Sequence, residues 1–334
     1  MRGPKAAGRL TRRGLFALVT AGAATAVLDR PARAVPDRPA PAGQVRAVDV
    51  GGRPAAVAVN PVTGLVYVAL PASGSVAVLD PVGARVIAVV PVGGAPGDLA
   101  VDPVTDRVYA ANPPAGTVLV IDAQTHTTVS VIGAGAGASS VAVDASANQV
   151  YAVSGSTGTL AVLDGVSLST QAIVPAPKPG LAGIALDPGR RIAYCTSPDT
   201  NSVELFDLGS GKFTASTGVG PAPTGIAVHE ASGTVFVANS AIHNMSIVDP
   251  VTRVQSRTVR LGSEPSSLAV HQGTETVYTN GGPNGLGRVD GKAGVLSGEL
   301  SLGVNPGAVA VDQRTRTVYV TDPLHGTVSI VRDF

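Results

Sequence analysis

Residues Leu99–Ile132 read LAVDPVTDRVYAANPPAGTVLVIDAQTHTTVSVI and contain four short β-prone runs separated by turn-forming residues. Branched and aromatic residues fill the runs, and Asp-Pro, Asn-Pro-Pro and Gly separate them, a pattern typical of consecutive strands. The pattern recurs, because Tyr109 has an aromatic counterpart in six other units, at Tyr67, Tyr151, Tyr194, Phe236, Tyr278 and Tyr319. Successive spacings are 42, 42, 43, 42, 42 and 41 residues.

Four strands in a repeat of about 40–45 residues are typical of one blade of a β-propeller. The seventh unit reaches Phe334 with only three strands, and Gln44–Val50 (QVRAVDV), just before the first unit, is a candidate for the fourth. We therefore predict an all-β, seven-bladed propeller over residues 44–334, with four-stranded antiparallel blades and a ring closed by this N-terminal strand. A closed ring needs no partner chain for stability, so we expect a monomer.

Two sets of repeated residues have structural interpretations. The aromatic ring in the second strand of each unit is expected to pack between blades, with the tyrosine hydroxyl bonded nearby. Acidic residues or asparagine end most first and third strands, as at Asn60, Asp102 and Asp122, and are expected to cap turn amides. The single cysteine, Cys195, is expected to be a small buried apolar residue.

Residues 1–34 differ from the repeats and have the features of an export signal. A basic start is followed by the uncharged, Ala-rich run 14–28, and Ala32-Arg33-Ala34 fits a small-x-small cleavage site. Arg12-Arg13 before a weakly apolar run resembles the twin-arginine signal. An uncleaved anchor is the alternative, but the run of fifteen residues is shorter than the roughly 20 that a spanning helix needs. Residues 35–43 are predicted to be a Pro-rich linker.

Removal of the signal would change the charge of the protein. Residues 35–334 contain 17 basic and 22 acidic residues, a formal charge of −5. Nucleic-acid binding is disfavoured because it requires a basic face. We predict a bacterial protein that is secreted or held in the cell envelope, with no membrane span after signal cleavage.

The units resemble the YVTN β-propeller repeat. The resemblance is carried by Thr317-Val-Tyr-Val-Thr, by Val235-Phe-Val-Ala-Asn239 and by third strands that end like Val120-Ile-Asp122. It covers the chain from about residue 44 to the end and implies a propeller of an exported or surface protein that binds something. Similar propellers occur in lactonases and in quinoprotein amine dehydrogenases, so the resemblance also allows an enzyme.

Function is expected at the loops that surround the central channel. Arg53 and Lys178 are candidates to hold a small polar or carboxylated ligand, with Glu264 and Asp98 orienting it. Two further candidates belong to the same group of loops, His243 and Asn305. The alternative is that these are ordinary solvated charges.

His229 and His271 take the turn position that Asp or Asn occupies in other units, in adjacent blades. They are candidate metal ligands, but the favoured interpretation is that each histidine replaces a turn aspartate. The sequence has no Ser-His-Asp order, phosphate loop or haem-attachment motif, and we expect no cofactor. A ligand- or protein-binding or scaffold module is therefore favoured over a lactonase-type hydrolase or quinoprotein-like dehydrogenase with its site in the channel.

Overall fold

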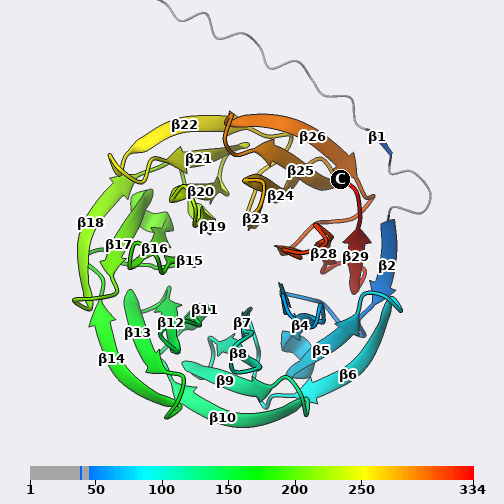
Figure 1. Ribbon diagram of the computed structural model, residues 1–334, viewed down its shortest axis with the longest axis horizontal. Coiled ribbons are helices and arrows are strands. Elements are labelled where there is room, and N and C mark those ends of the chain that lie inside the picture. The colour runs from blue at the N-terminus through cyan, green and yellow to red at the C-terminus, as the bar shows by residue number, and fades with distance from the viewer. Residues whose placement is uncertain (1–37, 40–44) are drawn as a thin grey trace, which may run out of the picture. The chain divides into compact units, whose positions relative to one another are not determined.

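The computed structural model describes residues 38–39 and 45–334, and in this part the chain forms a ring of seven blades (Figure 1). The predicted export signal and its cleavage site lie outside the described residues. The strands of the blades follow in chain order: β3 (Ala56–Val59), β4 (Val66–Leu70), β5 (Ser75–Asp80), β6 (Arg85–Pro91); β7 (Asp98–Asp102), β8 (Arg107–Asn112), β9 (Thr117–Asp122), β10 (Thr127–Gly133); β11 (Ala138–Asp144), β12 (Gln149–Ser154), β13 (Thr159–Asp164), β14 (Ser169–Pro175); β15 (Ile184–Asp187), β16 (Ile192–Ser197), β17 (Ser202–Asp207), β18 (Lys212–Gly218); β19 (Pro223–His229), β20 (Thr234–Asn239), β21 (Asn244–Val248), β22 (Gln255–Arg260); β23 (Leu268–His271), β24 (Thr276–Gly282), β25 (Gly285–Asp290), β26 (Val295–Ser301); β27 (Val309–Val311), β28 (Val318–Asp322), β29 (Thr327–Val331) and β2 (Val45–Asp49).

The predicted fold class is confirmed. Each blade is a meander whose first strand lies nearest the centre and whose fourth lies outermost, and every pairing between successive strands is antiparallel. The seventh blade takes β2 as its fourth strand, with Val45 opposite Val331 and Asp49 opposite Thr327. The N-terminal strand therefore closes the ring, as the incomplete last repeat predicts.

The segment 35–43 differs in part from the predicted linker. Within it, β1 (Arg38–Pro39) pairs in parallel with the outermost strand of the sixth blade, β26. An edge strand suits Pro39, because proline has no N–H to donate to a second neighbour. The helical elements of the described residues are two short 3₁₀ turns, η1 (Pro71–Ser73) and η2 (Pro198–Thr200). In this part of the chain no helix has the length and hydrophobicity needed to cross a membrane.

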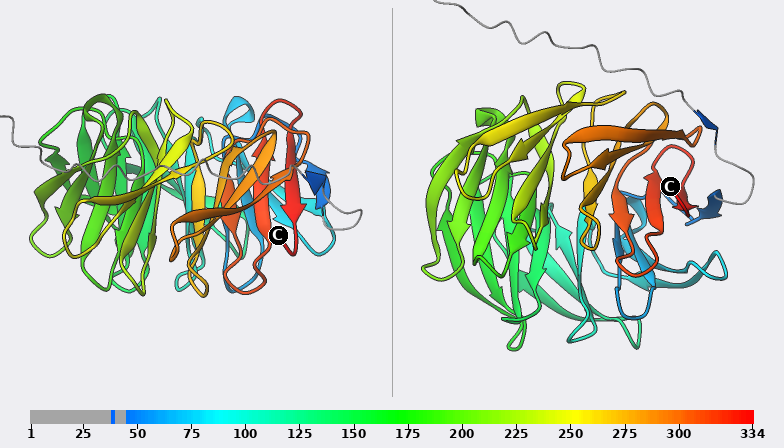
Figure 2. Two further views of the ribbon diagram at one scale, coloured as in Figure 1. Left: turned by 90° about the horizontal axis from the view of Figure 1, so that it is seen from above. Right: turned by 45° about the horizontal axis from the view of Figure 1, so that its top comes forward.

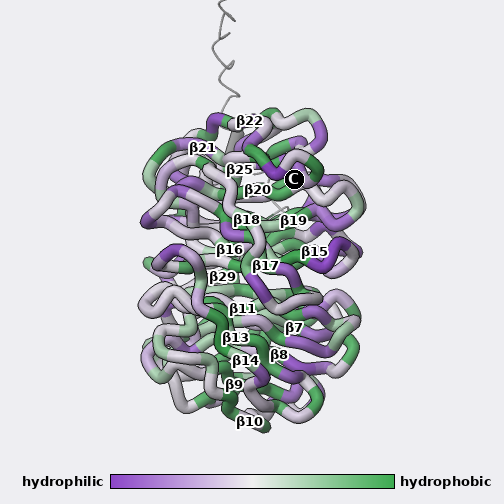
Figure 3. Tube along the Cα trace, turned by 90° about the vertical axis from the view of Figure 1, so that its left-hand side faces the viewer, coloured by the Kyte–Doolittle hydropathy of each residue, from purple (hydrophilic) through white to green (hydrophobic). Residues whose placement is uncertain are grey.

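The core consists of seven apolar clusters, one at each boundary between neighbouring blades. Apolar residues predominate in the strands, and hydrophilic residues are more frequent in the turns (Figure 3). All seven repeated aromatic side chains are at most 2% exposed, so the prediction that they pack between blades is confirmed.

The expectation for the tyrosine hydroxyls holds only in part. The Tyr278 hydroxyl donates to the Phe334 carbonyl at 3.2 Å, and that of Tyr151 to Gln149. Those of Tyr67 and Tyr194 are buried without a hydrogen-bond partner among the described residues. The aromatic ring is what the position requires, which agrees with Phe236 in the fifth blade.

The repeated acids cap turns, as predicted. Asp122 Oδ1 accepts the backbone N–H groups of Gln124 and Thr125, at 2.9 and 2.8 Å, and Asp102 Oδ1 accepts that of Val104. The hydrogen bond from the Thr125 backbone N–H is the main reason that the pKa of Asp122 lies below its ordinary value. First and third strands run in the same direction, so these capped turns share one face of the ring, while other turns connect the strands on the opposite face (Figure 2).

The innermost strands converge, and the sequence there adapts to the limited space. All seven blades have alanine two residues before the Asn, Asp or His that ends the first strand: Ala58, Ala100, Ala142, Ala185, Ala227, Ala269 and Ala310. Two residues earlier, the fourth and fifth blades have Gly183 and Gly225. A Cβ on Gly225 would lie 2.7 Å from the Ser266 carbonyl oxygen of the next blade, so only glycine fits against that backbone.

Candidate functional site

The central channel contains a cavity with a volume of about 470 Å³. Every blade contributes three consecutive residues to its wall, at the start of the first strand, such as Ala55–Val57 in the first blade and Gly97–Leu99 in the second. The residues are Ala, Gly, Ser, Thr, Val, Leu and Ile, with the single exception of Asp98. The volume lies in the range of small-molecule sites, about 300–1,000 Å³.

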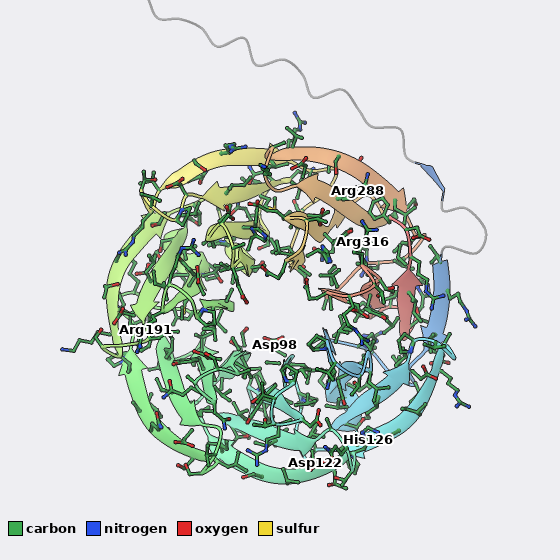
Figure 4. All side chains as sticks on the ribbon, viewed as in Figure 1. Asp98, Asp122, His126, Arg191, Arg288 and Arg316 are labelled. Atoms are coloured by element: carbon green, nitrogen blue, oxygen red, sulfur yellow. The ribbon has the colours of Figure 1, made fainter. Side chains whose placement is uncertain are left out.

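Asp98 lies at the wall of the central opening, at the start of β7 (Figure 4). Its Oδ2 accepts the Ser140 hydroxyl at 2.6 Å and the Val141 backbone N–H at 3.1 Å, both from the next blade. Its Oδ1 accepts the backbone N–H of Leu99 at 2.8 Å. The carboxylate therefore links two blades and remains half-buried beside the cavity.

The environment of Asp98 disfavours its charge. Burial raises the pKa of Asp98 above the ordinary value, and its three hydrogen bonds offset only part of this effect. The described residues of the cavity wall provide no cation to balance the carboxylate. An ionised Asp98 is thus a desolvated charge at the edge of an open channel.

The sixth blade makes the same link between blades without a charge. Ser267 stands at the position equivalent to Asp98, four residues before the end of the first strand, and its hydroxyl oxygen accepts the backbone N–H of Val309 at 3.0 Å. A serine is therefore sufficient for the hydrogen bond between blades. The negative charge of Asp98 is therefore not required for the hydrogen bond between blades.

Of the six residues proposed as ligand contacts, Asp98 alone belongs to the cavity wall among the described residues. His243 and Glu264 lie close together at the rim, with Nε2 and Oε1 3.7 Å apart and both side chains more than half exposed. Arg53 and Asn305 are exposed. Within the described part of the chain, neither of these two side chains has a hydrogen bond or ion pair. The structure thus places these four residues around the channel without forming a common pocket.

Lys178 points to a different partner. Its Nζ lies 3.5 Å from Oε1 of Glu204, a fully buried residue in β17, and donates to the Ser216 hydroxyl at 2.8 Å. Ser202 and Ser216 also donate to Glu204 Oε1, whereas Oε2 is buried and has no hydrogen-bond partner among the described residues. Lys178 from the loop between the third and fourth blades therefore covers a buried carboxylate.

Glu204 was missed by the sequence analysis, although one signal was available. Equivalent third-strand positions hold small or apolar residues, such as Ala77 and Leu119, so a glutamate in this position is exceptional. Cys195 lies opposite Glu204 in β16 and is fully buried, as predicted. Burial, with the negative charge of Glu204, raises the pKa of the Cys195 thiol, which therefore stays protonated.

His229 and His271 occupy equivalent turns at the other end of the first strands. Nδ1 of His229 lies 2.8 Å from the Ser232 hydroxyl, and Nδ1 of His271 lies 2.8 Å from that of Thr274. Asp102 receives a hydroxyl from Thr105 in the same way, so each histidine reproduces the turn contact of an aspartate.

Each of these imidazoles also contacts the following blade. The Nε2 atoms face the backbone carbonyls of Gln272 and Gln313, at 2.9 and 3.2 Å. A carbonyl can only accept, so each Nε2 carries a proton. Both ring nitrogens are engaged in these contacts. The described residues contain no group of three or more His, Cys, Asp or Glu side chains arranged to hold a metal ion.

Comparison with known proteins shows similarity in fold. Solved structures that resemble the ring include Kuenenia stuttgartiensis hydrazine synthase (14% identity, TM-score 0.72, covering 85% of this chain and 97% of that one). Others are U3-55K (11%, 0.78, covering 87% and 99%) and the WD40 repeats of RRP9 (12%, 0.76, covering 89% and 98%). No family model and no curated protein matches the sequence. At these identities the similarity extends to the propeller architecture alone.

The Lys178–Glu204 pair leads to a stability prediction. Lys178→Ala should lower the free energy of unfolding by about 2 kcal/mol, because it leaves a buried carboxylate without its cation. In a Glu204→Leu background, which copies Leu119 of the second blade, the same substitution should change it by less than about 0.5 kcal/mol. Chemical denaturation of the four proteins measures the coupling. Equal losses in both backgrounds would mean that the pair contributes nothing.

Proposed function

We propose that the propeller is a ligand-binding module that acts outside the cytoplasm and holds a small polar molecule in its central channel. The observation that carries the proposal is the cavity, whose wall consists mostly of small residues, with one Val, Leu or Ile from each blade and the single carboxylate of Asp98. The small side chains leave the centre of the ring open. A wall of this kind can admit a ligand without rearrangement of the blades.

Binding is favoured over catalysis by the chemistry of the channel wall. A lactonase-type hydrolase or a dehydrogenase needs several acid–base, metal-ligating or cofactor-holding groups that converge on one point. In the described part of the wall, Asp98 is the sole ionisable side chain. The resemblance to the YVTN repeat supports a binding role, because members of that family are mostly exported or surface proteins that are presumed to bind a partner.

Substitution at Ala55 tests the proposed site. Ala55 is exposed at the mouth of the channel, so Ala55→Trp should narrow the cavity without disturbing the core. The matched control is Ala172→Trp, at an exposed position on the outermost strand β14. We would screen amines, polyols, carboxylates and amino acids by ligand-observed nuclear magnetic resonance.

We expect at least one chemical class to bind the parent and the Ala172→Trp variant, and to lose at least tenfold in affinity with Ala55→Trp. If every chemical class binds the Ala55→Trp and Ala172→Trp variants with equal affinity, the channel is not the binding site.

Export by the twin-arginine route is the second part of the proposal. It is supported by Arg12-Arg13, by the weakly apolar run that follows and by Ala32-Arg33-Ala34. Replacement of both Arg12 and Arg13 by lysine should retain the protein in the cytoplasm of a twin-arginine-competent bacterium, as measured by fractionation and immunoblotting. Unchanged export of this double variant would contradict the proposed route.

A further inference from the structure

We propose that the channel ligand carries a primary ammonium group and that Asp98 is its counter-ion. This inference rests on the proposed binding function and specifies the chemical class of the ligand. It follows from the charge, the unused hydrogen-bonding capacity and the volume of the channel wall.

The charge of the wall excludes an acidic ligand. When Asp98 is ionised, the described wall carries one negative charge and no positive one. The two basic residues proposed to bind an anion both lie outside the wall, Lys178 because it is engaged by Glu204 and Arg53 because it is exposed at the rim. A carboxylated ligand would therefore meet repulsion from Asp98 and no compensating cation in the wall, whereas a cation would neutralise a desolvated carboxylate.

The hydrogen bonds of Asp98 leave room for one more donor. An ionised carboxylate has about two acceptor positions on each oxygen. Oδ2 already receives two donors, from Ser140 and Val141, whereas Oδ1 receives only the N–H of Leu99. One position on Oδ1 is thus unused, and Asp98 is partly exposed beside the cavity. A single N–H of a ligand would complete the set.

This geometry favours an ammonium group over other cations. A guanidinium binds carboxylates best through two parallel N–H bonds, which need both oxygens, and Oδ2 is saturated. A quaternary ammonium is usually recognised by aromatic rings, and the described wall contains none. A calcium ion needs about six to eight oxygen ligands, and Asp98 is the wall's one carboxylate.

Other polar groups of the wall can contact the rest of the ligand. The Ser267 hydroxyl accepts the N–H of Val309 and has no acceptor for its own hydrogen among the described residues, so it can donate to a ligand oxygen. The cavity of about 470 Å³ is large enough for a molecule of amino-sugar size. Burial raises the pKa of Asp98, which is consistent with a carboxylate that lacks its natural cation.

The test uses probes that share a skeleton and differ in charge. Glucosamine, glucose and glucuronate form one set, and 1,4-diaminobutane, 1,4-butanediol and succinate form a second. Affinities for the full propeller would be measured by calorimetry at low ionic strength. We expect the ammonium member of at least one set to bind at least tenfold more tightly than its neutral and acidic counterparts.

Two variants assign this preference to Asp98. Asp98→Ser copies Ser267, so it should keep the bond to Val141 and the fold, and should reduce ammonium binding to the level of the neutral probe. Glu230→Gln removes the same charge from an exposed residue at the other end of the channel and should leave binding unchanged. If Asp98→Ser does not fold, Asp98→Asn provides the same neutralisation.

The outcomes separate the two proposals. If neutral or acidic probes bind as tightly as ammonium probes and are lost with Ala55→Trp, the channel binds ligands but the ammonium inference is wrong. If ammonium binding persists in the neutral Asp98 variants, Asp98 is not the counter-ion. If no probe of any charge binds in a manner sensitive to Ala55→Trp, both proposals fail.

Discussion

The pairing of β2 with β29 is the interaction on which the rest of the structure depends. Five residues from the beginning of the described ring complete a blade whose other three strands come from the end of the chain. Without this pairing the seventh blade would present an open edge, and the cluster between the seventh and first blades would lose Val48 and Val50. Closure brings seven first strands around one axis, and the channel is a consequence of that geometry.

The convergence of these strands explains the unusual composition of the channel wall. Gly183 and Gly225 belong to the wall, where the neighbouring backbone is close, and the alanine two residues later in all seven blades continues the run of small residues along the first strands. The six other third-to-fourth strand pairs contain a register shift, whereas β2 and β29 pair without one. The open centre therefore follows from the geometry of the ring, and any specificity depends on the few positions where the repeat is broken.

Much of the fold was predictable because its determinants are local. The determinants lie within one unit and recur along the chain: turn acids such as Asp122 in six units, and strand alternation and the aromatic position of Tyr109 in all seven. The truncated last unit identified the closing strand. The candidate site was less predictable, because it depends on contacts between units. Asp98 was identified, but the pairing of Lys178 with the buried Glu204 could not be read from loop positions alone.

The same distinction applies to the role of Asp98. Only the alignment of blades in space shows that Ser267 makes the equivalent bond between blades, and therefore that the carboxylate is not needed for it. A charge that is desolvated, has no counter-ion and is not needed for the fold indicates a functional role. Residues that bind ligands often lower the stability of a protein relative to other residues at the same position. The central claim is thus that the protein retains this charge at some expense of stability.

The most direct test is the free energy of unfolding of the parent and of Asp98→Ser, measured between pH 3 and pH 8 without ligand. A carboxyl whose pKa is raised in the folded state binds its proton more tightly there than in the unfolded chain. Its ionisation therefore lowers stability as the pH rises above the ordinary aspartate range. We predict that the stability of Asp98→Ser relative to the parent increases from pH 3 to pH 8. A variant that is instead increasingly less stable than the parent over this range would show that the ionised carboxylate stabilises the fold, and would contradict the account.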